Sequence, residues 1–269
     1  MHETAWAKLN LALHVRERLA DGYHRIETLF AFAEHGDRLT VAAGEGLSLE
    51  IEGAFAASLS PDEDNLVLRA ARRLRDHAGI DAGARLILEK NLPVASGIGG
   101  GSADAAAALR LLSRWWRLDL PQSDRLAIAA ELGADVPACL LSRTARGVGR
   151  GDELTPFDAG TSGTPALLVN PGVAISTAAV FRGWDGVDRG PLADFKEGRN
   201  DLEPAALAIA PEIKAVLAAL RAHRPHLARM SGSGATCFAL FGTEAERDQV
   251  QAAIALSHPH WWQLSTRLR

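Results

Sequence analysis

The sequence predicts a mixed α/β protein of the α+β class, and three observations support this prediction. Leu9, Leu11, Leu13 and Val15 alternate with Lys8, Asn10, Ala12 and His14, which is the period of a half-buried strand. Residues 64–77 place their apolar side chains on one face of a helix. Strand and helix patterns are interspersed along the chain, which shows no internal repeat.

Local signals set the elements expected in the first half of the chain. A turn at Asp21-Gly22 separates the first strand from the next. The acidic residues at 62–64 favour the start of the helix at 64–77, because negative charge is stabilised at a helix N-terminus. Ser123 is a suitable N-cap for a later helix that stops at Gly133. The other elements expected here are strands at 25–33, 38–42, 47–52 and 85–89, a loop at 91–101, and helices at 103–116 and 123–132.

A change in composition divides the chain. Glycines and polar residues dominate residues 147–163, so we expect a boundary there between two domains, residues 1–155 and 156–269. The elements expected beyond it are a strand at 166–169, helices at 176–181 and 211–223, a strand–loop–strand across 230–241, a helix at 244–255 and a final strand near Trp261.

Composition excludes several classes of protein. The chain has 269 residues and a formal net charge of −4, and it has no run of five basic residues, so nucleic acid is not an expected partner. The longest uncharged stretch, residues 159–181, contains two prolines, so no membrane span is expected. The two cysteines, Cys139 and Cys237, suit a reducing compartment, and we expect a cytoplasmic protein that is a monomer or a homodimer.

The segment from Pro93 to Asp104, PVASGIGGGSAD, has the character of a phosphate-binding loop. Glycine allows positive φ and close approach of the backbone, so that consecutive N–H groups can converge on an anion at the start of a helix. Ser102 is expected at the helix N-cap, where it could bind a phosphate oxygen or a metal ion. The alternative is a flexible connector. The residues expected to contact phosphate are Pro93, Val94, Ala95, Ser96, Gly97, Ile98, Gly99, Gly100, Gly101, Ser102 and Ala103.

Other nucleotide-binding classes do not match this loop. A Walker A motif would need Gly-Lys-Ser/Thr where Gly101-Ser102-Ala103 stands, and a dinucleotide fingerprint would need glycine at Ser102. The sequence has no HRD or DFG triplet of a protein kinase.

The loop instead resembles that of the GHMP kinases, a superfamily of small-molecule kinases. Three segments resemble its branch that acts on a cytidyl-diphosphate sugar alcohol, namely AKLNL at 7–11, ADGYH at 20–24 and LGADVP at 132–137. SGSGATCFALF, at residues 231–241, resembles the superfamily's C-terminal glycine motif. The resemblance covers about residues 5 to 242. It implies the two-domain GHMP kinase fold with both substrates in a cleft between the domains.

The resemblance assigns catalytic roles to Asp135 and Lys8. The matching aspartate is the base that takes the proton from the acceptor hydroxyl, which suits phosphoryl transfer, since a carboxylate there orients the nucleophile. A lysine beside it would keep the carboxylate ionised and attract the transferring phosphate. Lys8 is one of only four lysines, and it lies on the polar face of the first strand. The alternatives are a loop aspartate that caps the next helix and a solvated lysine.

Substrate-binding residues are expected from the same resemblance. Tyr23, the only tyrosine, and Phe181 would sandwich a cytosine ring, and His24 would hydrogen-bond to it. Phe181 could equally belong to the core. Further residues expected near the acceptor substrate are Asn10, Thr177, Gly232, Ser233 and Gly234. The glycine turn at 232–234 could instead support the phosphate loop.

The resemblance also implies ATP and Mg²⁺, with no dedicated protein ligands for the metal other than the hydroxyl of Ser102. Asn65 and Lys90 match positions that line the adenine pocket of relatives, although Asn65 could equally be a first-turn helix residue. The chain departs from the family pattern at Ala95 and Ser96, where glycines are frequent, and at Ala103, where a serine is frequent. The resemblance favours phosphorylation of the 2-hydroxyl of the cytidyl substrate, in the non-mevalonate route to isoprenoid precursors.

Two other functions stay open. One is a GHMP kinase for a homoserine- or mevalonate-type acceptor, against which the aromatic turn at residues 20–24 argues. The other is a GHMP-fold metabolite sensor without catalytic activity, against which the presence of Asp135 and Lys8 argues. The histidines at 223–226 and 258–260 have no accompanying cysteine or carboxylate cluster, so we expect surface residues there instead of a metal site.

Overall fold

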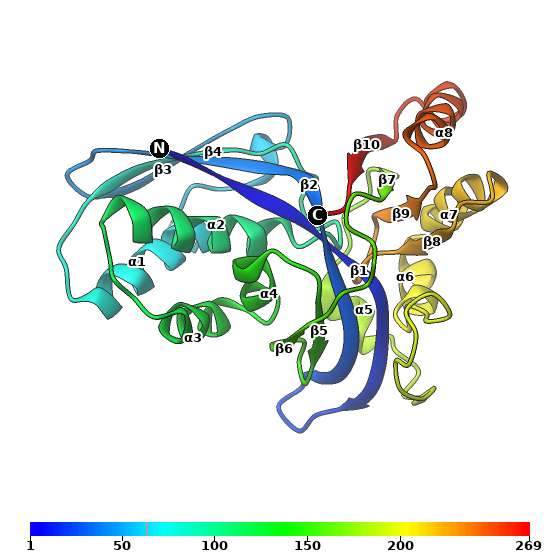
Figure 1. Ribbon diagram of the computed structural model, residues 1–269, viewed down its shortest axis with the longest axis horizontal. Coiled ribbons are helices and arrows are strands. Elements are labelled where there is room, and N and C mark those ends of the chain that lie inside the picture. The colour runs from blue at the N-terminus through cyan, green and yellow to red at the C-terminus, as the bar shows by residue number, and fades with distance from the viewer. Residues whose placement is uncertain (63) are drawn as a thin grey trace. The chain divides into compact units, whose positions relative to one another are not determined.

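The computed structural model describes residues 1–62 and 64–269, so Glu63 of the acidic run at 62–64 lies outside the described residues (Figure 1). The chain forms two compact units. Unit 1 comprises Met1–Ala7, His35–Val94 and Gly99–Ser142, and unit 2 comprises Lys8–Glu34, Ala95–Ile98 and Arg143–Arg269. This division by packing interleaves segments of the chain, whereas the expected domains 1–155 and 156–269 are consecutive stretches and stay a prediction.

Two long strands pass through both units. Strand β1 (His2–Arg18) pairs with β2 (His24–Ala42). The prediction of two separate strands at 25–33 and 38–42 was wrong, because β2 continues through Gly36. Gly36 permits a close approach to β1 in place of a turn, since a Cβ there would lie 1.9 Å from the carbonyl oxygen of Ala5.

Unit 1 combines a small sheet with helices. Strand β3 (Leu47–Glu52) runs parallel to β4 (Ala84–Glu89), and β4 runs antiparallel to residues 38–42 of β2. Helices α1 (Leu66–Ala78) and α2 (Gly100–Trp115) pack against each other (Figure 1). Residues 103–109 of α2 are all buried, so this alanine-rich helix forms the centre of the unit. The other elements are the 3-10 helix η1 (Ala56–Ser58), α3 (Gln122–Leu132) and α4 (Val136–Leu141).

Two expectations for unit 1 need correction. Helix α3 begins at Gln122 with Pro121 at the N-cap, and the hydroxyl of Ser123 donates to Asp124 instead of capping the helix. Helix α4 was not predicted, because its six residues are too few to show a helical period.

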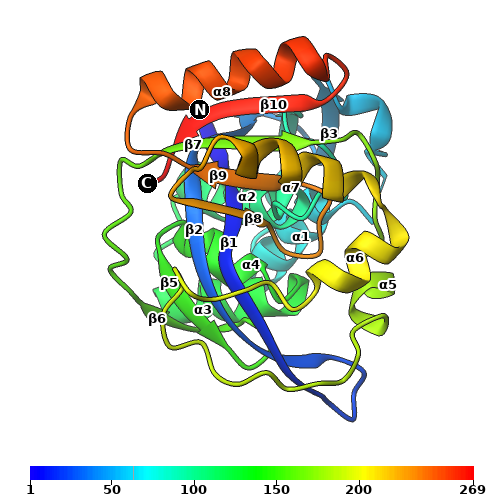
Figure 2. The ribbon, with the colours of Figure 1, turned by 90° about the vertical axis from the view of Figure 1, so that its right-hand side faces the viewer.

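Unit 2 is built on a four-stranded antiparallel sheet in the order β10-β7-β9-β8. Helices α7 and α8 pack on one face of this sheet (Figure 2). A short hairpin of β5 and β6 pairs with residues 28–30 of β2. The bounds of the elements in this unit are β5 (Ala145–Val148), β6 (Glu153–Pro156), β7 (Pro165–Asn170), α5 (Thr177–Arg182), α6 (Glu203–Ile209), α7 (Glu212–Ala222), β8 (Leu227–Met230), β9 (Cys237–Leu240), α8 (Glu244–Ser257) and β10 (Trp262–Arg267).

The strands and helices expected after residue 165 are present, while β5, β6 and α6 were missed. The β5–β6 hairpin was interpreted as a linker because residues 147–163 are rich in glycine, which is typical of loops. The first strand was wrongly expected to be half-buried, because residues 7–15 are buried on both faces, including Lys8, Asn10 and His14. Its polar residues are therefore enclosed, and each requires a partner.

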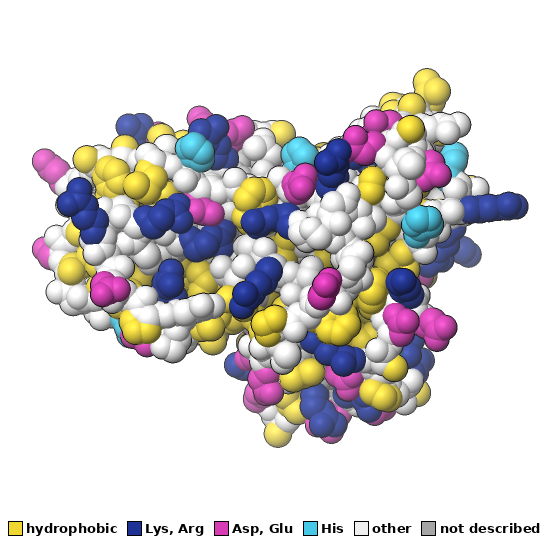
Figure 3. Space-filling model, in the orientation of Figure 1, with side chains coloured by type: hydrophobic (Ala, Val, Ile, Leu, Met, Phe, Trp, Pro, Cys, Tyr) yellow, Lys and Arg dark blue, Asp and Glu magenta, His cyan; other side chains and the backbone are white. Residues whose placement is uncertain are grey.

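Basic and acidic side chains are interspersed over the face shown in Figure 3. This pattern agrees with the small formal net charge of −4. In the part of the chain that the structure describes, every helix is too short or too polar to traverse a lipid bilayer.

Helix α8 provides a test of the fold. The hydroxyl of Thr243 accepts from the N–H of Glu246 at 3.2 Å, and the Glu246 carboxylate accepts from the N–H of Thr243 at 3.1 Å. Loss of such a cap costs about 1 kcal/mol. We expect Thr243→Ala to lower the free energy of unfolding by about that amount in urea denaturation. Thr243→Ser should keep the cap, and equal stability of the alanine variant and the native chain would contradict the assignment.

Candidate active site

The glycine loop ends at the N-terminus of α2. Gly99 is the N-cap, with φ +65°, and its carbonyl accepts from the N–H of Ala103 at 2.8 Å. Ser102 therefore lies in the first turn and not at the N-cap, because a glycine in the left-handed region lets the helix begin at Gly100. The first N–H groups of the helix and its dipole make this end a site for an anion.

The middle of the loop, residues 95–98, packs within unit 2 against the second glycine turn. The hydroxyl of Ser231 donates to the carbonyl of Gly97 at 3.0 Å, and the N–H of Thr236 donates to the carbonyl of Ser96 at 3.0 Å. Gly97 has φ +77°, and a Cβ there would lie 2.4 Å from the carbonyl oxygen of Ser231. The two glycine motifs seen in the sequence are thus one packed structure.

Ala95, which stands where the resemblance led us to expect glycine, has an unusual backbone conformation. Its φ is +51°, a region that a residue with a Cβ occupies only at a cost. A glycine would adopt this conformation without strain, which agrees with the glycine that the resemblance led us to expect there.

Lys8 and Asn10 form a buried polar network in unit 2. Lys8 is 3% exposed, and its ammonium donates to Asn10 Oδ1 at 2.9 Å and lies 5.2 Å from the centre of the Phe30 ring. The Asn10 amide donates to Thr28 at 2.8 Å, and the N–H of Asn10 donates to the Ser231 hydroxyl at 3.2 Å. This burial excludes the alternative of a solvated lysine.

Thr177 and Ser233, both expected near the acceptor, are joined by a hydrogen bond of 2.9 Å between their hydroxyls. Thr177 is the first residue of α5 and Ser233 lies in the turn between β8 and β9, so the bond joins two segments distant in sequence. Gly232 and Gly234 flank Ser233 with φ values of +54° and +86°, which only glycine adopts without strain.

The predicted aromatic residues lie in unit 2. The rings of His24 and Phe181 have centroids 5.0 Å apart, and Trp184 meets His24 edge-on at 5.7 Å. Tyr23 is 51% exposed, and the Arg150 guanidinium lies over its ring at 4.9 Å. Phe181 packs partly against the core, so its structural alternative is also present.

His24 offers an unused polar atom in this cluster. Its side chain is 8% exposed, and within the described residues its Nε2 has no hydrogen-bond partner. Burial, together with the charge of Arg18, lowers the pKa of His24 below its ordinary value of 6.5. The ring is therefore neutral at pH 7 and can donate or accept one hydrogen bond to a ligand.

Asp135 is the N-cap residue of α4 in unit 1. Its side chain makes no capping hydrogen bond, so the alternative of a helix cap does not account for it. Asp135 and Lys8 belong to different units, and their catalytic pairing stays a prediction.

Of the two residues expected near adenine, Asn65 caps α1 by accepting from the N–H of Val67 at 3.0 Å. Lys90 is 1% exposed, and its ammonium binds Asp37 and Asp104. The structure thus shows a structural partner for each, and their nucleotide contacts stay predictions.

Comparison with known proteins gives the family. The family model described as "GHMP kinases N terminal domain" matches residues 65–143, and the model described as "GHMP kinases C terminal" matches residues 188–259. A 4-diphosphocytidyl-2-C-methyl-D-erythritol kinase of Rhizorhabdus wittichii is 54% identical over 100% of this chain and 96% of its own length. The chain belongs to the 4-diphosphocytidyl-2-C-methyl-D-erythritol kinase family of the GHMP kinases.

Other members of this family support the assignment. A relative of the same name from Parvibaculum lavamentivorans is 49% identical over 97% of this chain and 95% of its own length. A crystal structure of a 4-(cytidine 5′-diphospho)-2C-methyl-D-erythritol kinase has a TM-score of 0.82 at 33% identity and covers 99% of both chains. A homoserine kinase structure from Cytophaga hutchinsonii, with a TM-score of 0.72 at 17% identity over 98% of this chain and 95% of its own, shows the fold alone.

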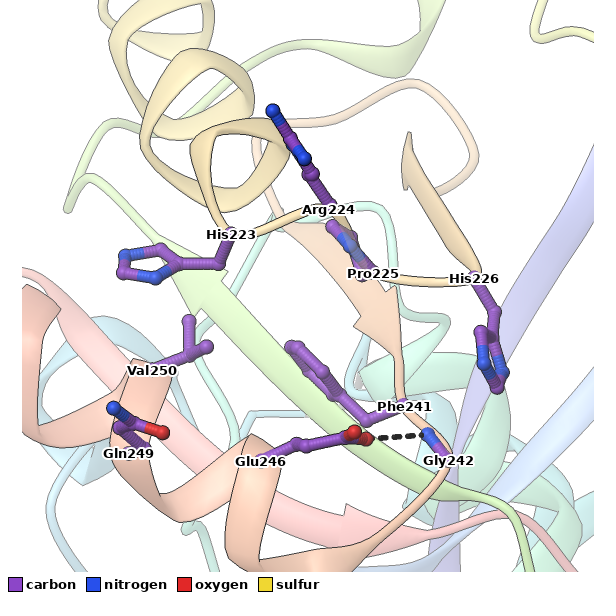
Figure 4. A pocket seen from close by; sticks show the side chains of 9 residues that line it. All are labelled: His223, Arg224, Pro225, His226, Phe241, Gly242, Glu246, Gln249 and Val250. Atoms are coloured by element: carbon purple, nitrogen blue, oxygen red, sulfur yellow. Dashed lines mark hydrogen bonds between the residues drawn. The ribbon is translucent and has the colours of Figure 1, made fainter.

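The histidines at 223–226 line a surface pocket of about 190 Å³ in unit 2 (Figure 4). His223 and His226 lie on opposite sides of the pocket, and Glu246 accepts from the N–H of Gly242 at 3.0 Å (Figure 4). Both histidines are exposed, as the sequence predicted.

Sequence reasoning missed several residues that hold the site together. Ser231 and Thr28 anchor Asn10, and Trp184 packs on His24. Asp37 and Asp104 bind Lys90. None of these positions carries a local pattern, although an aspartate directly after a glycine loop was a signal that could have been pursued.

The close packing of Gly97 leads to a prediction. Gly97→Ala would place a Cβ against backbone atoms at positive φ, so we expect lower thermal stability and at least tenfold weaker ATP binding by calorimetry, equivalent to about 1.4 kcal/mol. Gly160→Ala is the matched control, since Gly160 has φ +62° with nothing within 4 Å of its Cβ position. It should keep ATP affinity, and equal affinity in both variants would show that this packing does not matter.

Proposed function

We propose that this chain is an ATP-dependent kinase that phosphorylates the 2-hydroxyl of 4-diphosphocytidyl-2-C-methyl-D-erythritol, in the non-mevalonate route to isoprenoid precursors. The main support is that relatives of that name align over almost the whole of this chain and of their own length. Two features of the structure agree with it. The two glycine motifs pack together, and among the described residues His24 Nε2 in the aromatic cluster has no hydrogen-bond partner. The first feature suits the phosphates of ATP, and the second suits a flat base with polar edges.

The glycine loop would hold the phosphates of ATP. The backbone N–H groups at the start of α2 and the helix dipole supply a positive field there. The loop needs no side-chain charge for this purpose, because backbone groups held in place lose little freedom when the anion binds.

Asp135 would act as the base. Its carboxylate takes the proton from the 2-hydroxyl while that oxygen bonds to the γ-phosphorus. The bond between that phosphorus and the bridging oxygen breaks, and ADP leaves. Lys8 would stabilise negative charge on the transferring group. Asn10 would keep the ammonium of Lys8 oriented through their 2.9 Å hydrogen bond.

Mg²⁺ is the expected companion of ATP, and the available donors fit it only as a phosphate-bound ion. The described residues hold no group of three or more histidine, cysteine, aspartate or glutamate side chains that could bind a metal. Ser102, in the first turn of α2, offers a hydroxyl ligand. The ion would neutralise charge on the β- and γ-phosphates.

The cytidyl group would occupy the aromatic cluster. Tyr23 and Phe181 would stack on the base, and neutral His24 would bind its polar edge. Thr177, Ser233 and the glycines at 232 and 234 would contact the rest of the acceptor.

The test is ADP release by the purified chain with MgATP and four acceptors in turn: the cytidyl erythritol, homoserine, mevalonate and galactose. We expect turnover with the first alone. Turnover with another acceptor would retain a kinase and reject the cytidyl site. ATP binding without turnover on any acceptor would favour a sensor.

We expect Asp135→Asn to lower kcat by about 10²–10⁴ while ATP affinity is nearly kept, because the amide cannot take the proton. Steady-state kinetics and calorimetry with an ATP analogue would measure the two effects. Unchanged turnover would remove Asp135 from the mechanism.

We expect Tyr23→Ala to raise the KM of the cytidyl substrate by about tenfold or more, since stacking contributes roughly 1–3 kcal/mol per base. Tyr23→Phe keeps the ring and serves as the control. The KM of ATP should change little in both variants, and an equal rise in both KM values would assign Tyr23 to the fold.

A further inference from the structure

A buried cluster of three charges lies in unit 1 beside the start of the phosphate loop. The Lys90 ammonium donates to Asp37 Oδ2 at 2.5 Å and to Asp104 Oδ2 at 2.6 Å. The exposed fractions are 1% for Lys90, 0% for Asp37 and 2% for Asp104. Burial by itself would lower the pKa of Lys90, but the charges of Asp104 and Asp37 outweigh it and raise that pKa. The two carboxylates therefore favour the charged form of Lys90.

Such a cluster is a poor way to gain stability. Removing ions from water costs several kcal/mol each, and buried ion pairs are often replaceable by apolar side chains without loss. Asp104 Oδ1 has no hydrogen-bond partner within the described residues, and burial raises the pKa of Asp104 to about 7. A costly and incompletely satisfied cluster calls for a function other than stability.

The contacts of the cluster show what it holds. Asp37 Oδ1 accepts from the N–H groups of Asn91 at 2.6 Å and Leu92 at 2.8 Å, directly before the loop begins at Pro93. Asp104 is the fifth residue of α2, directly after the loop. A Cβ at Gly100 would lie 3.0 Å from Lys90 Nζ, so the ammonium packs directly against the helix start. One cation thus ties the strand side of the loop to its helix side.

The backbone of Lys90 is also held. Its N–H donates to the carbonyl of Glu52 at 2.7 Å, and its carbonyl accepts from the N–H of Phe55 at 3.1 Å. The backbone of Lys90 is hydrogen-bonded to Glu52 of β3, and its ammonium is bound to two carboxylates. Because Lys90 is held at both ends, it can keep the two ends of the loop in fixed positions.

We propose that Lys90, through its ion pairs with Asp37 and Asp104, is a positioning residue that holds both ends of the phosphate loop and so sets the affinity for the phosphates of ATP. This role rests on the proposed function, in which that loop binds ATP. The positive charge of Lys90 also offsets the negative charges of Asp37 and Asp104, which would otherwise repel the phosphates.

The test is Asp104→Asn in the full chain, which keeps the size of the side chain and weakens its bond to Lys90. We expect the KM of ATP and the Kd of ADP to rise about tenfold, as for loss of a charged hydrogen bond. The KM of the cytidyl substrate should change less than twofold. Glu3→Gln is the matched control, because Glu3 also forms ion pairs with side chains of α2, Arg110 and Arg114, which are not members of this cluster. It should leave both KM values unchanged.

A second variant tests the same role if the Asp104→Asn variant does not fold. Lys90→Gln with Asp37→Asn and Asp104→Asn replaces all three charged groups by amides that can still hydrogen-bond. No unpaired charge stays buried, so this variant should fold and show the same selective loss of ADP affinity. Equal changes in both KM values, or unchanged ADP affinity in a folded variant, would overturn the positioning role. If the native chain itself does not bind ADP, the proposed function fails first, and calorimetry on the native chain distinguishes the two failures.

Discussion

The contact between two glycine turns in unit 2 is the constraint on which the rest of the candidate site depends. Gly97 lies so close to the carbonyl of Ser231 that no side chain fits between them. This contact fixes the backbone of the loop at Gly97. In the proposed function that matters, because N–H groups can bind an anion only while they converge on it. The same Ser231 hydroxyl also accepts from the N–H of Asn10, so the position of Lys8 follows from the same contact.

Two kinds of buried polar structure coexist in this chain. The Lys8 and Asn10 network encloses one ammonium group, and the side chains of Asn10 and Thr28 in it are neutral hydrogen-bonding groups. The Lys90 cluster encloses three ionisable groups in a small volume, which is costly. Lysine is scarce in this sequence, at four residues among 29 basic ones, and two of the four are enclosed in this way. Their compact ammonium groups suit such sites better than the broad guanidinium of arginine.

Much of the fold could be predicted because its signals are local. Helices α1, α2, α7 and α8 have clear apolar faces or caps, and most strands carry β-branched or alternating residues. The elements that were not predicted, such as α4 and the β5–β6 hairpin, are short or rich in glycine. The predicted first strand covers only the middle of β1, which runs from His2 to Arg18, and its burial on both faces depends on packing that alternation cannot reveal.

The sequence alone determined the family resemblance, and it predicted the candidate phosphate loop and the candidate base, because each depends on residues that are adjacent in the chain. Only the tertiary structure decided what Lys90 binds, since Asp37 and Asp104 lie 53 and 14 positions from it. It also decided that Gly97 packs against Ser231, a contact across 134 positions. Folding brings such groups together through hydrogen bonds and steric fit between distant segments, and no local pattern records which partner each one meets.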